Sequence, residues 1–146
     1  MIQHAALVGT DTATICIFDL EAMRHRKDDV GDWWSLPRNE LAEVRSGNAL
    51  FLNLGSDGTY RIEVSQLNDP TVEGFCLKTP SRRVFIGAGE EMSGGGLEPT
   101  GVCGGLFLDV DEAHQKVSIT RTDNTLAIKF QAAEAFENDV TNLINL

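Results

Sequence analysis

The stretch ALFLNLGSDGTYRIEVS at residues 49–65 decides the fold class. In its second half Tyr60, Ile62 and Val64 are apolar, and the residues between them are polar. This alternation is typical of an antiparallel strand with one face in the core and the other in water. Asp57-Gly58 stands between two apolar runs, and this dipeptide favours the tight turn of a β-hairpin. The stretch therefore predicts two strands that pair with each other across that turn.

Short apolar or β-branched runs separated by turn residues continue along the chain. We expect further strands at residues 12–18, 74–78, 83–86, 106–110, 117–122 and 126–130. The Thr-Asp-Asn-Thr sequence at 122–125 predicts a second hairpin between the last two of them. About eight short strands without alternating helices predict a mainly β fold, an antiparallel β-sandwich or a partly open barrel with one or two short helices. The length fits a single domain over residues 1–146.

Two helical segments are expected between the strands. Residues 37–46 (PRNELAEVRS) have Pro37 in the first turn and Gly47 at the stop, and both placements favour a helix. Ser35 is the candidate N-cap. A shorter segment at 20–26 also has helical spacing.

The C-terminal tail allows two interpretations. From Phe136 onward its apolar residues recur at i, i+4, i+7 and i+8, which predicts a short helix within residues 132–146. A last strand near 141–146 is the alternative.

The charge of the chain favours a cationic partner. Its net charge is −10, from 22 acidic and 12 basic residues. Direct binding of nucleic acid needs a basic surface, and anionic membranes repel an acidic one, so neither partner is expected. Many nucleases are cationic because they bind phosphate backbones, and an acidic chain suits them. Solubility alone is the alternative reason for such a charge. Residues 84–146 hold ten acidic and three basic residues, so we expect any acidic face there.

No motif for catalysis, cofactor or metal is present in the sequence. Cys16, Cys76 and Cys103 are odd in number and widely spaced, which predicts free thiols and fits a reducing cytoplasm. The first ten residues do not resemble a signal peptide. The histidines lack the spacing of a zinc site. The glycine-rich stretch Gly87–Gly105 has no Gly-Lys-Ser/Thr, so it is not a P-loop. We expect no cofactor, no metal, no catalytic residues and no enzymatic activity.

Six residues are candidates for partner binding. Trp33 and Trp34 are adjacent, so in an extended segment one would be buried and the other exposed, and we select Trp33 as an interface anchor. The alternative is that both pack the helix onto the sheet. Glu90 and Glu91 lie in the glycine-rich stretch, which is either a recognition loop or a loop that needs positive φ angles. The remaining candidates form an acidic turn, which is favoured over a calcium-type site: Asp109, Asp111 and Glu112.

Four segments carry a resemblance to a known family. They are DTATICIFDLEAMRHRKDD at 11–29, DWW at 32–34, GNALFLNLGSDGTYRIEV at 47–64 and RVFIGAGEEMSGGGLEP at 83–99. Together they resemble an uncharacterised bacterial family of short acidic proteins encoded beside polymorphic or type VI secreted toxins. A weaker similarity is to competence-nuclease inhibitors, which are also small, acidic and β-rich. Both resemblances imply an immunity protein that binds a cognate toxin, a basic secreted nuclease, and occludes its active site. The resemblance implies no functional residues.

Two other functions stay open at this point. One is a β-module that binds a sugar or small metabolite through Trp33 or Trp34 and the glycine-rich loop. The other is an enzyme of an unrecognised type, because a triad can assemble from residues that are distant in sequence.

Overall fold

The computed structural model describes residues 3–29, 31–93 and 97–146, and within them it contains ten strands, one α-helix and three short 3₁₀-helices. The strands are β1 (His4–Thr10), β2 (Thr14–Phe18), β3 (Ala49–Asn53), β4 (Gly58–Gln66), β5 (Phe75–Lys78), β6 (Arg83–Ala88), β7 (Leu106–Asp109), β8 (His114–Thr122), β9 (Thr125–Ala132) and β10 (Ile144–Asn145). The helices are η1 (Leu20–Arg26), η2 (Trp33–Ser35), α1 (Pro37–Ser46) and η3 (Gly89–Met92).

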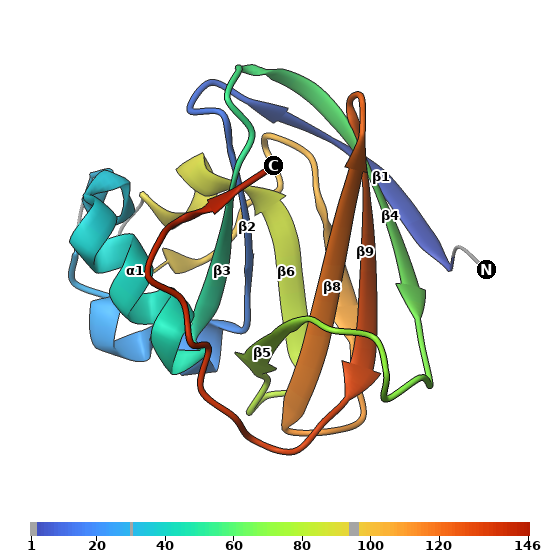
Figure 1. Cartoon of the computed structure of the whole chain (residues 1–146). Coiled ribbons are helices and arrows are strands. Elements are labelled where there is room, and N and C mark those ends of the chain that lie inside the picture. Colours follow the sequence, from blue (N-terminus) through green and yellow to red (C-terminus); the bar gives the residue numbers. More distant parts are fainter. Residues whose placement is uncertain (1–2, 30, 94–96) are drawn as a thin grey trace.

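The strands form two five-stranded sheets that pack face to face (Figure 1). One sheet has the order β1-β4-β9-β8-β5, and the other has the order β10-β3-β2-β6-β7. The predicted mainly β sandwich is confirmed. It is not purely antiparallel, because β4 pairs with β9 and β10 pairs with β3 in parallel. The two sheets do not close into a barrel, so the sandwich describes the fold better than the alternative of a partly open barrel.

The predicted hairpin at 49–65 is wrong, although both of its strands exist. β3 lies in the second sheet beside β2, whereas β4 lies in the first sheet between β1 and β9. The turn at Asp57-Gly58 therefore carries the chain from one sheet to the other. The second predicted hairpin is confirmed, since Thr122 pairs with Thr125 across a two-residue turn in which Asp123 has a φ of 53°.

Helices cover part of the outer face of the second sheet, so its central strand β2 is buried on both sides. All five residues of β2 are buried, since η1, η2 and α1 lie over this face (Figure 1). The Trp34 ring stacks on Phe51 of β3 at a centroid distance of 6.0 Å, and the Trp33 ring meets Phe51 edge-on at 6.2 Å. Both tryptophans thus pack the helical layer onto the sheet.

The α1 helix confirms the prediction for residues 37–46, but its N-cap is not the predicted Ser35. Leu36 occupies the cap position and makes no side-chain cap bond. Ser35 instead donates its hydroxyl to the Asp32 carbonyl oxygen at 2.6 Å. Gly47 ends the helix with a φ of 73°, a left-handed conformation that glycine adopts at low cost.

The C-terminal tail is extended, so the predicted helix is wrong and the alternative strand is confirmed. The tail crosses from β9 to the other sheet and ends in β10 beside β3. Asn138 holds it in place: its side chain accepts a bond from the Cys76 N–H at 2.7 Å and donates to the carbonyl oxygens of Val44 at 2.7 Å and Cys76 at 2.9 Å. These bonds need an extended tail, which the apolar spacing alone does not reveal.

None of the helices formed by residues 3–29, 31–93 and 97–146 has the length and apolar character that crossing a membrane requires.

Candidate functional site

Five of the six predicted partner-binding residues fall into two groups at opposite ends of β6. Arg83, at the start of β6, pairs with Asp109, and the turn with Asp111 and Glu112 follows directly. Glu90 and Glu91 lie in η3, just beyond the other end of the strand. The six residues of β6 lie between the two groups, and a strand of this length spans about 20 Å.

Glu90 serves as an internal hydrogen-bond acceptor. Its carboxylate accepts from the hydroxyls of Thr10 at 2.8 Å and Thr12 at 2.5 Å and from the Asp11 N–H at 2.8 Å. Burial opposes the charge on Glu90, but these hydrogen bonds outweigh it and hold the pKa of the carboxyl below its ordinary value. Glu90 thereby ties η3 to the turn between β1 and β2.

Glu91 fixes the later part of the glycine-rich stretch. It is only 7% exposed, and its oxygens accept from the Thr100 hydroxyl at 2.9 Å and the Gly101 N–H at 2.6 Å. Because these bonds already use both carboxylates, the geometry gives Glu90 and Glu91 a structural role. That Glu90 and Glu91 contact a partner stays a prediction, and these hydrogen bonds do not support it.

Trp33 is buried, contrary to its selection as an exposed anchor. It is 8% exposed, and its indole N–H donates to the Met92 carbonyl oxygen at 3.0 Å. The Arg26 guanidinium lies over its ring, 4.6 Å from the centroid. Trp34 is 3% exposed and donates to the Ser93 hydroxyl. Neither ring is available as the stacking platform of a sugar site.

Asp109, Asp111 and Glu112 are exposed, and the turn that carries them is anchored through its backbone. The Val110 N–H donates to the Arg82 carbonyl oxygen at 2.9 Å, and the Thr79 hydroxyl donates to that of Glu112 at 2.6 Å. Within residues 3–29, 31–93 and 97–146, the three carboxylates make no ion pair or hydrogen bond. Three free charges thus stand on a rigid support.

Phe107 lies beside this turn and was missed by the sequence analysis. It is 43% exposed, and the Arg83 guanidinium lies 4.2 Å from its ring centroid. Phe107 and Glu98 line the same cavity of about 260 Å³. In the run Leu106-Phe107-Leu108 only Leu108 is buried, so alternation places Phe107 on the opposite face. We call Glu98, Phe107, Asp109, Asp111 and Glu112 the β7 acidic surface.

Metal-binding and thiol chemistry have little support among the described residues. No three potential metal ligands gather there. Burial raises the pKa of the Cys16 thiol, and burial together with the nearby Glu90 and Glu91 raises that of Cys103. Because thiolates are the reactive form, neither cysteine is activated.

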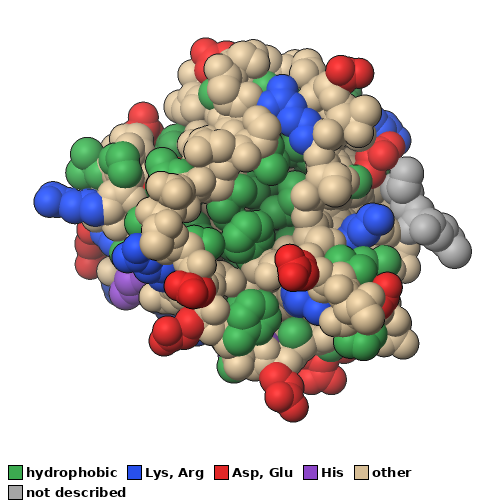
Figure 2. Space-filling view, in the orientation of Figure 1, with side chains coloured by type: hydrophobic (Ala, Val, Ile, Leu, Met, Phe, Trp, Pro, Cys, Tyr) green, Lys and Arg blue, Asp and Glu red, His purple; other side chains and the backbone are tan. Residues whose placement is uncertain are grey.

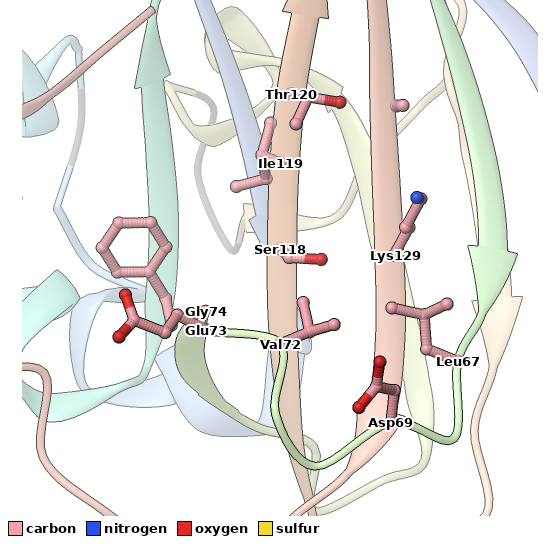
Figure 3. A pocket seen from close by; sticks show the side chains of 11 residues that line it. Leu67, Asp69, Val72, Glu73, Gly74, Ser118, Ile119, Thr120 and Lys129 are labelled. Atoms are coloured by element: carbon pink, nitrogen blue, oxygen red, sulfur yellow. The ribbon is translucent and has the colours of Figure 1, made fainter.

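A large cavity lies on the outer face of the first sheet (Figure 3). Its volume is about 650 Å³, and its walls are β8, β9 and the segment between β4 and β5. Its lining combines apolar side chains, the hydroxyls of two β8 residues and three charged groups: Leu67, Val72, Phe75, Ile119, Ala127, Ser118, Thr120, Asp69, Glu73 and Lys129. Hydrogen bonds from Thr71 hold the pKa of the Asp69 carboxyl below its ordinary value, so Asp69 is an unsuitable proton donor at neutral pH.

Two solved structures are similar to this chain. "Crocagin biosynthetic gene J" is 13% identical, with a TM-score of 0.57, and the match covers 89% of this chain and 97% of that one. ComJ from Bacillus subtilis, described as an inhibitor of the DNA-degrading activity of NucA, is 12% identical with a TM-score of 0.51 over the same shares. At such identities the likeness concerns the fold. No curated protein matches the sequence. A family model matches residues 1–146 in full, so the chain belongs to the family of unknown function DUF6386.

Proposed function

We propose that this protein is an immunity-type inhibitor without enzymatic activity, which binds a basic, nuclease-like bacterial toxin and covers its working surface. The observation that carries the proposal is the β7 acidic surface, where three unpaired carboxylates on an anchored turn lie beside an exposed aromatic ring. The fold shared with ComJ, an inhibitor of a DNA-degrading protein, supports a nuclease as the class of target.

The surface suits capture of a cationic protein in two steps. A net charge of −10 attracts a basic partner and speeds their encounter, an effect that salt screens over about 8–10 Å. Close contact then buries Phe107, since aromatic side chains surrounded by polar groups are common anchors of interfaces. Fast capture in the cytoplasm of the producing cell would protect its DNA before the toxin acts.

Co-expression with the product of a neighbouring toxin gene tests the proposal. We expect the two proteins to co-purify and the toxin's nuclease activity to be inhibited. Absence of a complex at micromolar concentrations would contradict an inhibitor function.

A variant in which three carboxylates are replaced by uncharged amides tests the β7 acidic surface itself. The triple substitution Asp109→Asn, Asp111→Asn and Glu112→Gln should slow association about tenfold at low salt. The matched control removes three exposed acids of the tail by Glu134→Gln, Glu137→Gln and Asp139→Asn. Equal slowing by both triple variants would show that only the total charge matters and that the β7 acidic surface is not the contact.

A further inference from the structure

The β8 strand has one edge that is only half covered. Along one side it pairs with β9 from Gln115 to Thr122. Along the other side β5 pairs only with His114–Val117. Within residues 3–29, 31–93 and 97–146, no strand pairs with this second side between Ser118 and Thr122.

Two residues of β8 direct their backbone groups toward the open side. The Val117 carbonyl oxygen faces β5, since a Cβ added to Gly74 would lie only 2.6 Å from it. In an antiparallel strand every second residue presents its N–H and C=O to the same neighbour. Ile119 and Arg121 therefore direct theirs to the uncovered edge, where up to four backbone bonds are available.

The rest of this side of the sandwich is closed. Asn138 pairs with the backbone of Cys76 on the outer edge of β5, and the Lys78 N–H donates to the Gly47 carbonyl oxygen at 2.7 Å. At the other end the Arg121 guanidinium bridges the sheets, donating to the carbonyl oxygens of Leu54 at 2.7 Å and Leu146 at 3.2 Å. Proteins usually protect free strand edges, so the edge at Ile119 stands out against its closed neighbours.

The open edge separates two different environments. On the outer face lies the cavity of about 650 Å³, with Ser118 and Thr120 on β8 and the charged groups of Asp69, Glu73 and Lys129 in its wall (Figure 3). Ile119 points away from Ser118 and Thr120 (Figure 3). On that side Figure 2 shows apolar side chains in a hollow between the positions of β3 and β8. The apolar side chains Phe75 and Ile119 are partly exposed at the edge of the core.

We propose that this edge of β8 binds an extended segment of the toxin by strand addition. The added strand would bond to the backbone of Ile119 and Arg121 and place alternate side chains on the two faces. Its apolar residues would enter the hollow beside Ile119, and its basic residues would face Asp69 and Glu73. The proposal rests on the proposed function, because the segment belongs to the toxin. A second copy of this chain is a poor occupant, since two chains of net charge −10 repel each other.

Nuclear magnetic resonance with a synthetic probe tests the site without the toxin. The probe is a capped eight-residue peptide of alternating lysine and valine, and its control carries proline in place of each valine at the same charge. At about 1 mM probe we expect the amide signals of Ile119 and Arg121 to shift and their solvent exchange to slow about tenfold. The amides of Ser118 and Thr120, which face β9, should change little. No shift, or an equal shift with the proline peptide, would overturn the proposal.

Substitutions on both faces test the same contact. Ile119→Asp should weaken probe binding at least tenfold, which corresponds to about 1.4 kcal/mol. Thr59→Asp adds the same charge elsewhere in the sheet and should not weaken probe binding. Glu73→Lys changes an exposed position, so it should weaken probe binding without altering the core. Glu134→Lys is its control and should not weaken probe binding. Equal binding by all four variants would refute the site.

The two proposals can fail separately. Co-purification of a toxin that leaves the amides of Ile119 and Arg121 unprotected would overturn strand addition and leave the inhibitor function standing. Probe binding without capture or inhibition of any neighbouring toxin would support the edge and contradict the inhibitor function. Concentration-dependent dimers that protect these amides would assign the edge to a second copy and overturn the proposal.

Discussion

We expect Glu43→Gln to destabilise the protein, whereas Glu40→Gln, three residues earlier in α1, should stabilise it. Both side chains are buried at 3% exposure. Glu43 accepts hydrogen bonds from His25 at 2.7 Å, Asn48 at 2.9 Å and Arg26 at 3.0 Å. Burial opposes its charge, but these bonds outweigh it and hold the pKa of the carboxyl below its ordinary value. The charged form is therefore the one that the fold stabilises.

The size of the stability loss expected for Glu43→Gln follows from these contacts. A glutamine keeps one acceptor oxygen but turns its N–H₂ group toward two of the three donors, whichever oxygen it replaces. Losing one charge-assisted bond costs about 1.5–3 kcal/mol, and the half-exposed His25 contributes the least, so we expect a loss of about 2 kcal/mol. For 146 residues the entropy of unfolding is about 0.3 kcal/mol per kelvin, which makes the expected fall in Tm about 7 °C.

Glu40 has the opposite balance. Burial raises the pKa of its carboxyl, and the hydrogen bond from Asn53 at 3.1 Å offsets this only in part. A glutamine keeps the acceptor for Asn53 and removes the buried charge. We expect a gain of about 1 kcal/mol, or a rise in Tm of about 3 °C.

Thermal unfolding at neutral pH, followed by circular dichroism, measures both variants under one condition. Each serves as the control for the other, because they make the same chemical change on the same helix. Shifts of equal sign would refute the assignment of the two electrostatic environments. So would a Glu43→Gln variant with an unchanged Tm.

Three further predictions concern the tail, the proposed contact and pH. Asn138→Ala leaves the backbone of Cys76 without its partner, so chemical denaturation should show a loss of about 2–3 kcal/mol, and a loss within error would count against the anchoring role. Phe107→Ala should cost less than about 1 kcal/mol of stability but weaken toxin binding at least tenfold in calorimetry, and unchanged affinity would remove Phe107 from the interface. The depressed pKa values of Glu43 and Glu90 contribute stability above the ordinary glutamate value of about 4.3, which is lost as the pH falls through the folded-state values. Urea unfolding across that range should show the decline, and stability that rises on acidification would contradict it.

The sequence by itself determined the local features of this protein. Alternating apolar residues located β4, and Pro37 with Gly47 located α1, because side-chain periodicity and backbone preference act over a few residues. The two-residue turn at Asp123-Asn124 was likewise readable, since its strands are neighbours in the chain. The free acids at Asp109–Glu112 were located for the same reason: their turn is local and polar.

Only the tertiary structure decided the features that depend on distant partners. Alternation shows that a strand has a buried face but not which strand lies beside it, so β3 and β4 could not be assigned to different sheets. Glu90 could be recognised as an internal acceptor only after the fold placed Thr10 and Thr12 against it. The open edge at Ile119 exists because β5 begins only at Phe75, opposite Val117. The length over which two strands pair is set by the whole sheet, since each pairing competes with every other contact that the chain can make.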